Sequence, residues 1–189
     1  MAAEFHAREI SRLFHIKIEV YGFDNAAGLP EIQEDCIEKE VPYWFYGGRY
    51  NYMNVGKLTK RLRTAKLIIG DIRETLNNFI DVYKPAPIGF ISVDVDQYAG
   101  TAAILSFLES DDKNFLPRMY MYFDDINISV ESRGEHRAVL EFNQKNRNMK
   151  ILPEDSTTKG KMCLRYQHPL YAKEIKGDET MCAYSLFTI

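Results

Sequence analysis

Two stretches of this chain change abruptly from apolar to acidic, and they limit the folds that are open to it. The first is Ile91-Ser92-Val93-Asp94-Val95-Asp96, and the second is Tyr120-Met121-Tyr122-Phe123-Asp124-Asp125. A nearly continuous apolar run is typical of a strand in a parallel sheet that helices cover on both faces. In such sheets, ligands bind just beyond the carboxyl ends of the strands. Two neighbouring strands of this kind would hold several carboxylates at one site, which suits a hard divalent cation, a base, or both.

The composition is typical of one soluble globular domain. The chain has 189 residues, of which 46% are hydrophobic and 27% are charged, so residues 1–189 can bury one sizeable core. A net charge of −3 gives no general attraction to nucleic acid or to an anionic membrane. The basic stretch Lys57–Arg63 carries apolar residues at helical spacing, and we interpret it as a solvated helix face.

The cysteines are Cys36, Cys163 and Cys182, which are widely spaced and odd in number. This spacing argues against a disulfide scaffold and against a structural zinc site, and it fits a reducing compartment. The sequence has no apolar run of transmembrane length, and its first residues do not resemble a signal peptide. We therefore expect a cytoplasmic protein without a membrane partner.

Strand and helix patterns alternate along most of the chain. Apolar residues at helical spacing predict helices over residues 2–14, 55–64, 72–83, 98–109 and 134–146. Strands are predicted over 16–23, 65–69, 88–94 and 116–123, and over 149–152, 162–166 and 182–188 in the tail. This order predicts one α/β domain with a mostly parallel sheet.

Four predicted strands end in an acidic residue: Asp24, Asp71, Asp94 and the pair Asp124-Asp125. Aspartate is common at strand ends because it caps turns and helices. Collected at one edge of a sheet, however, these carboxylates repel one another unless a cation or a cationic ligand neutralises them. Two chemistries fit. Single carboxylates can accept hydrogen bonds from ribose hydroxyls or an adenine amino group, and Asp94 with Asp124 and Asp125 suits octahedral ligation of Mg²⁺.

The Asp94-Val95-Asp96 segment has other interpretations. An Asp-x-Asp pair also binds the metal-diphosphate group in nucleotide-sugar transferases, so a metal-dependent transferase of that class is an alternative. Aspartate-nucleophile phosphatases need a downstream lysine and an acidic motif in an order that this chain lacks. A third hypothesis is a non-catalytic domain that acts as an oligomeric or partner-binding module.

Taken in order, several segments resemble class I S-adenosylmethionine-dependent methyltransferases, and more closely the metal-dependent macrocin/mycinamicin-type sugar O-methyltransferases. These segments are Val20–Asp24 with Gly28-Leu29-Pro30, Leu67–Leu76, Gly89–Tyr98 and Phe123–Asp125. The resemblance covers residues 15–145 and implies a Rossmann-like three-layer α/β/α fold with an antiparallel C-terminal strand. It also implies Mg²⁺-assisted methyl transfer from S-adenosylmethionine to a hydroxylated, sugar-like small molecule, by a protein that can form a homo-oligomer.

The resemblance implies a donor site at the ends of two strands. Asp24 would lie near the ribose of S-adenosylmethionine. Asp71, helped by Ile72, would face the adenine.

The resemblance also implies a metal and acceptor site. Asp94, Asp124 and Asp125 resemble the metal ligands, and Asp94 or Asp125 would be the catalytic residue that prepares the acceptor hydroxyl. His136 is a weaker candidate for that role, because a histidine next to an arginine at a helix start is more commonly a surface residue. The aromatic segment Tyr43–Tyr52 either fills the core or forms a lid or wall of the acceptor site.

The chain departs from this family at its N-terminal end. The family's first strand and glycine-rich loop should precede residues 2–14, but the first glycine is Gly22 and no G-x-G motif occurs. In the family's strand order, 3-2-1-4-5-7-6, losing the first strand leaves two interior edges unpaired. Three explanations are a truncated chain or misassigned start codon, a degenerate homologue with a rearranged sheet, and a strand supplied by a partner. Under either of the first two explanations, residues 1–189 would be a single, N-terminally incomplete methyltransferase-like domain.

Overall fold

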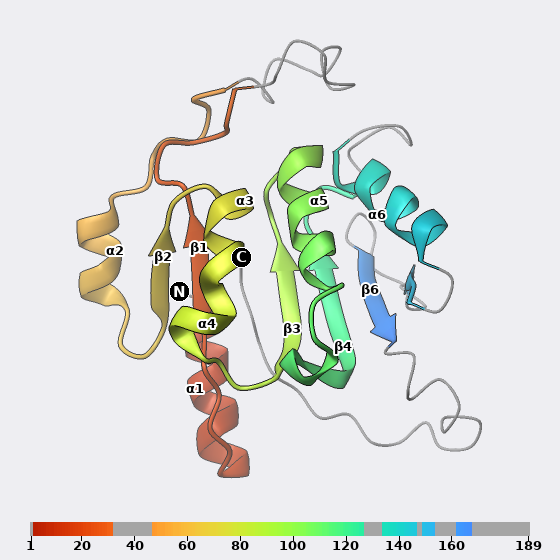
Figure 1. Cartoon of the computed structure of the whole chain (residues 1–189). Helices are drawn as coiled ribbons and strands as arrows, with labels where there is room; N and C mark the ends of the chain where they lie inside the picture. Colours follow the sequence, from red (N-terminus) through yellow and green to blue (C-terminus); the bar gives the residue numbers. More distant parts are fainter. Residues whose placement is uncertain (1, 32–46, 127–133, 147–148, 154–161, 168–189) are drawn as a thin grey trace.

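The computed structural model describes residues 2–31, 47–126, 134–146, 149–153 and 162–167. Its strands are β1 (Tyr21–Asp24), β2 (Lys66–Ile69), β3 (Ile88–Val93), β4 (Phe115–Phe123), β5 (Ile151–Pro153) and β6 (Met162–Gln167) (Figure 1). Its α-helices are α1 (Ala2–Phe14), α2 (Val55–Arg61), α3 (Ile72–Thr75), α4 (Phe79–Tyr83), α5 (Tyr98–Phe107) and α6 (Gly134–Lys145). The alternation of strands and helices predicted from the sequence is therefore confirmed within these ranges.

The described strands form two sheets that share one core. β1 and β2 are a parallel pair, and the second sheet has the order β3-β4-β6-β5. In that sheet β3 and β4 are parallel, whereas β6 runs antiparallel to β4 and β5. Buried side chains of both sheets belong to one continuous hydrophobic cluster. The described strands follow the order that the resemblance implies for the strands after its first, and no pairing among the described residues joins β1 to β3.

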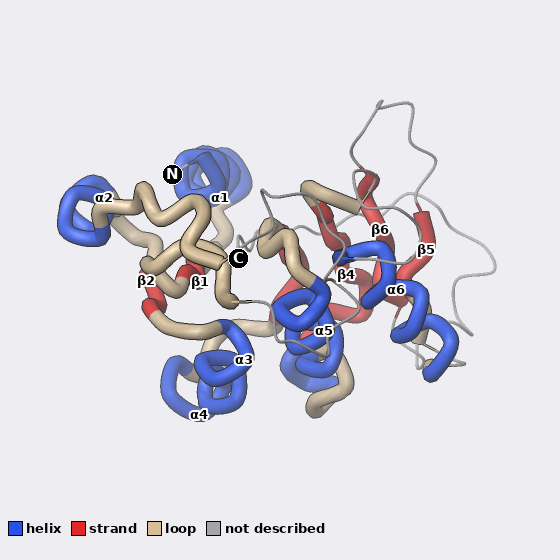
Figure 2. The backbone as a smooth tube through the Cα atoms, turned by 90° about the horizontal axis from the view of Figure 1, so that it is seen from above, coloured by secondary structure: helices blue, strands red, loops and turns tan. Residues whose placement is uncertain are grey.

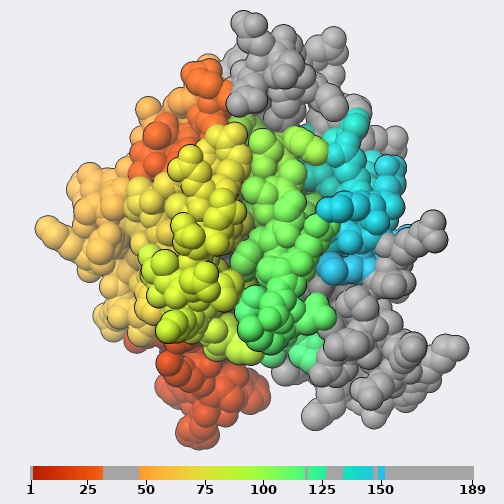
Figure 3. All heavy atoms as spheres, viewed as in Figure 1, coloured from red at the N-terminus to blue at the C-terminus, as the bar shows by residue number. Residues whose placement is uncertain are grey.

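Helices cover the strands on two sides. Figure 2 shows α1 and α2 on one side of the strands and α3, α4 and α5 on the other. Figure 3 shows the second side filled by α3, α4 and α5, which lie next to one another over the strands. The predicted three-layer α/β/α class, with parallel strands and an antiparallel strand near the C-terminal end, is confirmed. That the family's first strand is missing stays a prediction.

Two element boundaries differ from the sequence prediction. The strand predicted over 16–23 begins only at Tyr21, where its pairing with β2 starts opposite Lys66. The helix predicted over 72–83 is divided by a 3-10 turn, Leu76–Asn78, which contains two asparagines, weak helix formers. As predicted, the helical segment stops before Pro85. The strand predicted over 182–188 lies outside the described residues.

The basic stretch Lys57–Arg63 lies mostly on α2. Lys57, Lys60 and Arg61 are exposed, whereas Leu58 is half-buried. Its interpretation as a solvated helix face is confirmed. Neither α2 nor any other helix in the described ranges is long and apolar enough to cross a membrane.

An aromatic series led by Phe79 holds the two sheets in one core. The Phe79 ring is 1% exposed and makes edge contacts with Tyr21 and Phe23 of β1, at centroid distances of 5.0 and 5.2 Å. It also contacts Phe107 of α5 at 6.2 Å, and Phe107 contacts Phe115 of β4 at 5.5 Å. Each such pair contributes about 0.5–1.5 kcal/mol beyond its buried area. The series therefore connects β1 to β4 through two helices.

Parallel pairing aligns the ends of neighbouring strands. The Asp124 N–H donates to the Val93 carbonyl at 3.0 Å, where β3 and β4 end. Asp24 lies opposite Ile69, and the Gly70 N–H donates to the Asp24 carbonyl at 3.0 Å. The residues that follow these four strands therefore emerge at their carboxyl ends, where ligands bind in folds of this class.

Glu4 fastens α1 to the segment that precedes β2. Its Oε1 accepts the backbone N–H groups of Arg63, Thr64 and Ala65 at 2.6, 2.5 and 3.1 Å. The residue is 6% exposed. Burial disfavours the charged carboxylate, but the hydrogen bonds from Thr64, Ala65 and Arg63 outweigh it and lower the pKa of Glu4 to about 2.

We expect Glu4→Gln to lower the free energy of unfolding at pH 7 by about 1–3 kcal/mol, because the buried carboxylate accepts charge-assisted hydrogen bonds. A carboxyl whose pKa is lowered by folding stabilises the fold above its ordinary pKa of 4.5, and this contribution is lost as the pH falls toward 2. Urea unfolding at pH 7 and pH 3 should therefore show a larger acid-induced loss for the wild type than for Glu4→Gln. Glu9→Gln, on an exposed part of the same helix, is the control. An equal acid-induced loss in wild type and Glu4→Gln would contradict this assignment.

Candidate active site

A cavity of about 520 Å³ opens at the carboxyl ends of β1, β2, β3 and β4. Its volume lies in the range of small-molecule sites. The loops that follow the four strands line it, and they bring every predicted donor-site and metal-site residue to its wall. Those residues are Asp24, Asp71, Ile72, Asp94, Asp124 and Asp125.

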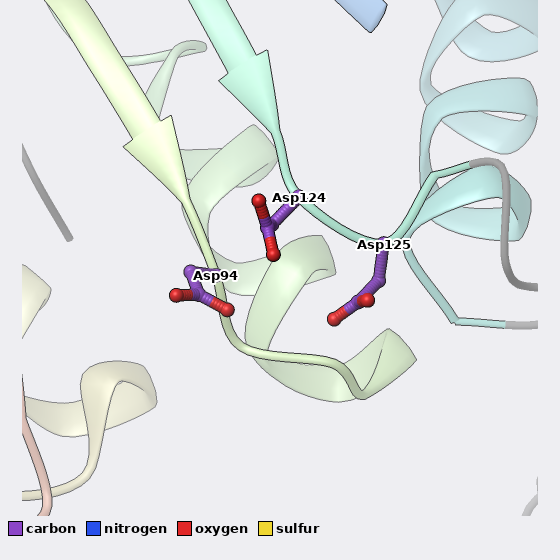
Figure 4. Close-up of side chains that lie close together, drawn as sticks. All are labelled: Asp94, Asp124 and Asp125. Atoms are coloured by element: carbon purple, nitrogen blue, oxygen red, sulfur yellow. The ribbon is translucent and has the colours of Figure 1, made fainter. Parts of the chain in front are cut away.

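Asp94, Asp124 and Asp125 converge within this cavity. Asp94 follows β3, the other two follow β4, and Figure 4 shows the three side chains turned toward one shared space. One carboxylate oxygen of each lies within 4.8 Å of the others. The Tyr122 hydroxyl donates to Asp124 Oδ1 at 2.7 Å and helps to orient that carboxylate. The structure thus brings the three predicted metal ligands together.

The donor set of this cluster fits a hard divalent cation. Three carboxylates offer anionic oxygens, which Mg²⁺ prefers, and Mg²⁺ usually keeps several waters or substrate oxygens in its octahedron. The cluster opens to the cavity, so a substrate oxygen can reach the same space.

Asp96 lies in a strained turn beside this cluster. Its φ is +55°, and the Gln97 N–H donates to the Val95 carbonyl at 2.5 Å, which closes a three-residue turn around Asp96. Such a turn is rare for a residue other than glycine, and strain of this kind is concentrated at functional sites. Burial raises the pKa of Asp96 to about 8, and a hydrogen bond shared with Asp125 adds to the effect. The sequence indicated Asp96 only through its Asp-x-Asp spacing.

Gln97 connects the loop that follows β3, which holds Asp94 and Asp96, to the loop that follows β1. Its side chain is buried, and its Nε2 donates to the Pro30 carbonyl at 2.9 Å. Its carbonyl accepts the Thr101 N–H at 3.2 Å and the Thr101 hydroxyl at 3.1 Å, in the first turn of α5. Gln97 therefore joins the two sides of the cavity rim.

The loop after β1 is folded by hydrogen bonds to a distant segment. Asp24 Oδ1 accepts the Ala26 N–H at 2.7 Å, and this turns the chain directly after the strand. Leu29 and Arg49 are joined by a hydrogen bond from the Leu29 N–H to the Arg49 carbonyl at 2.7 Å, and the Gly48 N–H donates to the Leu29 carbonyl at 2.7 Å. Asp24 is exposed toward the cavity that this loop borders.

Asp71 and Ile72 lie at the start of α3. The Asp71 carboxylate caps this short helix by accepting the Arg73 N–H at 2.9 Å, and it forms an ion pair with the Arg73 guanidinium. The hydrogen bonds from Arg73 hold the pKa of Asp71 below its ordinary value. Ile72 is half-buried and packs against the core. No sequence pattern indicated that the Arg73 side chain would form an ion pair with the Asp71 carboxylate.

Two buried polar groups of α6 lie near the acids. Glu135 is fully buried, and its Oε2 accepts the Asp125 N–H at 3.0 Å, while its Oε1 has no hydrogen-bond partner among the described residues. Burial raises the pKa of Glu135 to about 9, and the negative charges of Asp125 and Asp94 add to this. His136 is half-buried rather than on the surface, and it is not among the described residues that line the cavity. Sequence reasoning missed Glu135, since a glutamate in a first helical turn is ordinary.

Tyr50 belongs to the predicted aromatic segment and lines the cavity. It has a φ of +62°, and its pKa is raised by burial and by the charges of Asp96 and Asp125. Tyr52 is 84% exposed and fills no core. Residues 43–46 of the segment lie outside the described residues. Tyr50 therefore supports the interpretation of this segment as a wall of the site.

Comparison with solved structures identifies the fold. The O-methyltransferase NovP superposes with a TM-score of 0.60 over 88% of this chain and 67% of NovP, at 15% sequence identity. The calicheamicin methyltransferase CalS11 superposes with a TM-score of 0.58 over 87% of this chain and 79% of CalS11, at 14% identity. This chain has a methyltransferase fold. No family model and no curated protein matches its sequence. At this level of identity the likeness shows the fold.

We expect Gly28→Ala to lower the free energy of unfolding by about 2–4 kcal/mol. Gly28 has a φ of +83°, and an added Cβ would lie 2.1 Å from the Arg49 carbonyl oxygen, a backbone atom that cannot rotate away. Gly48→Ala is the matched control, since Gly48 has a φ of +73° but no heavy atom within 4 Å of the added Cβ. Its expected cost is about 1 kcal/mol, from backbone conformation alone. Equal costs in urea unfolding would show that the contact with Arg49 does not constrain the cavity loop.

Proposed function

We propose that this chain is an O-directed methyltransferase that uses S-adenosylmethionine and a divalent cation, in the manner of macrocin/mycinamicin-type sugar O-methyltransferases. The observation that carries the proposal is one cavity that joins Asp24 and Asp71 to the acidic cluster of Asp94, Asp124 and Asp125. The methyltransferase fold supports it, and the structural neighbour NovP is an O-methyltransferase. The acceptor in this proposal is a small hydroxylated molecule such as a sugar.

The donor would occupy the side of the cavity formed by the loops after β1 and β2. The Asp24 carboxylate uses Oδ1 for the turn to Ala26, and its other oxygen would accept hydrogen bonds from ribose hydroxyls. Ile72, which lines the cavity, would offer apolar contact to the adenine. Asp71 forms an ion pair with Arg73, and its carboxylate would accept a hydrogen bond from the adenine amino group.

The cation and the acceptor would occupy the side formed by the loops after β3 and β4. Asp94, Asp124 and Asp125 would hold the cation, and Tyr50 would border the acceptor. When bound, S-adenosylmethionine supplies an electrophilic methyl group on sulfur, and the cation lowers the pKa of the acceptor hydroxyl.

In this proposal the carboxyl pair of Asp96 and Asp125 is the base that removes the proton of the acceptor hydroxyl. Asp96, in its strained turn, and Asp125 both line the cavity that the donor residues also line. In the proposed reaction one carboxylate oxygen of the pair takes the proton of the acceptor hydroxyl. The freed oxygen forms a bond to the methyl carbon while the carbon–sulfur bond of the donor breaks. Asp94, on the opposite side of the cluster, is the second candidate for this role.

We expect Asp124→Asn to weaken Mn²⁺ binding about 10- to 100-fold, because it removes one of three anionic ligands. Mn²⁺ is a spectroscopic substitute for Mg²⁺, and the free ion can be counted by electron paramagnetic resonance. Asp81→Asn, at an exposed position of α4, is the control and should bind Mn²⁺ as the wild type does. Unchanged affinity in Asp124→Asn would contradict the assignment of this cluster.

We expect calorimetry to show binding of S-adenosylmethionine to the wild type and a loss of about 10- to 100-fold in Asp24→Asn. Asparagine keeps an oxygen for the Ala26 N–H, so the loop should survive while the charged acceptor is lost. Asp81→Asn again serves as the control. Binding of a nucleoside diphosphate with Mn²⁺ and not of S-adenosylmethionine would refute the methyltransferase proposal and favour the transferase.

A further inference from the structure

Gln97 is a buried polar side chain that joins two walls of the cavity. It is 5% exposed, precedes α5 directly and lines the cavity. Its Nε2 donates to the carbonyl of Pro30, a residue 67 positions away in the chain, at 2.9 Å. A buried amide is stable only where its polar atoms are bonded, so this contact fixes the position of both partners. It connects the β1 loop (residues 25–31) to the β3 loop (residues 94–97).

The backbone of Gln97 is fixed on both sides. Its N–H donates to the Val95 carbonyl and closes the turn around Asp96, while its carbonyl accepts the N–H and the hydroxyl of Thr101 in the first turn of α5. The side chain therefore extends from a backbone that is anchored to a helix. Because the same backbone forms the turn at Asp96 and leads back to Asp94, a force on the Gln97 side chain acts on the residues that line the cation side of the cavity.

The β1 loop has an unfavourable backbone conformation that individual hydrogen bonds hold in place. Ala26 has a φ of +60° and Gly28 a φ of +83°, in a region that residues with a Cβ rarely adopt. The Leu29 N–H donates to the Arg49 carbonyl on one side of the loop, and Gln97 binds the loop from the other side. Loops of this kind open at low free-energy cost, and a ligand that binds them must first order them.

We infer that Gln97 couples the donor side of the cavity to the cation side. A cation bound by Asp94 and its neighbours fixes the β3 loop, and the bond to Pro30 passes this order to the β1 loop beside Asp24. S-adenosylmethionine then pays less to order its own loop, and by linkage the donor favours the cation to the same extent. This inference rests on the donor and the cation of the proposed function. Because Gln97 acts through Pro30, it is a positioning residue.

The test is calorimetry of S-adenosylmethionine with and without saturating Mn²⁺, on the wild type and Gln97→Met. Methionine is similar to glutamine in length and size but has no N–H to donate. The coupling ratio is the Kd without Mn²⁺ divided by the Kd with Mn²⁺, and we expect it to be about 3- to 10-fold smaller in Gln97→Met. Direct repulsion between the cation and the sulfonium acts in both proteins and cancels in this comparison. Gln144→Met, at an exposed position of α6, is the matched control and should keep the wild-type ratio.

Hydrogen exchange separates this role from a purely structural one. Mn²⁺ alone should slow the exchange of backbone amides in residues 25–31 of the wild type, and it should not do so in Gln97→Met. A merely structural role would weaken donor binding equally with and without Mn²⁺ and leave the coupling ratio unchanged. Equal ratios in the wild type and Gln97→Met overturn the inference, as does exchange in the wild-type β1 loop that does not respond to Mn²⁺.

The outcomes also distinguish this inference from the proposed function. A wild type that binds both ligands, with the same coupling ratio as Gln97→Met, overturns the inference and leaves the proposed function standing. A wild type that does not bind S-adenosylmethionine or does not bind Mn²⁺ overturns both. If Gln97→Met does not fold, Gln97→Asn takes its place, because asparagine keeps the amide but withdraws it from the Pro30 carbonyl by one methylene. A smaller coupling ratio in that variant supports the inference, and a wild-type ratio overturns it.

Discussion

The parallel pairing of β3 with β4 is the constraint on which the candidate site depends. The bond from the Asp124 N–H to the Val93 carbonyl closes this pairing at the carboxyl ends of both strands. Because side chains alternate along a strand, a slip of one residue would turn Asp94 away from Asp124. The register is held by the core, in which Met121 and Phe123 are fully buried. Packing deep in the molecule therefore sets the distances between carboxylates at its edge.

The candidate site concentrates features that destabilise a fold. Asp96 has a positive φ, and Glu135 is buried with one oxygen that bonds to no described residue. One oxygen from each of three carboxylates also lies within 4.8 Å of the others. Each is unfavourable in the free protein, and proteins keep such features where binding compensates for them. The aromatic contacts of Phe79 and the buried hydrogen bonds of Glu4 lie away from the cavity, and they stabilise the scaffold that holds these groups.

The organisation of the fold and much of the site could be predicted from the residues. The acidic ends of β3 and β4 were visible as apolar runs that stop at Asp94 and Asp124, and the structure brings both to one cavity. The pairing of Asp71 with Arg73 was not predicted, because many arrangements of two nearby charged side chains are open to a sequence. Nor was the contact of Glu135 with Asp125, which depends on how α6 packs against α5.

The order of strands and helices and the acids at the strand ends can be read from the residues, because both follow from local periodicity and from abrupt changes of polarity. The burial of each carboxylate and its hydrogen-bond partners depend instead on tertiary packing. Those properties arise when segments far apart in the chain exclude water from the same space, and no local pattern records them. Asp96 and Glu135 acquire their chemistry in this way, from the neighbours that the fold brings to them.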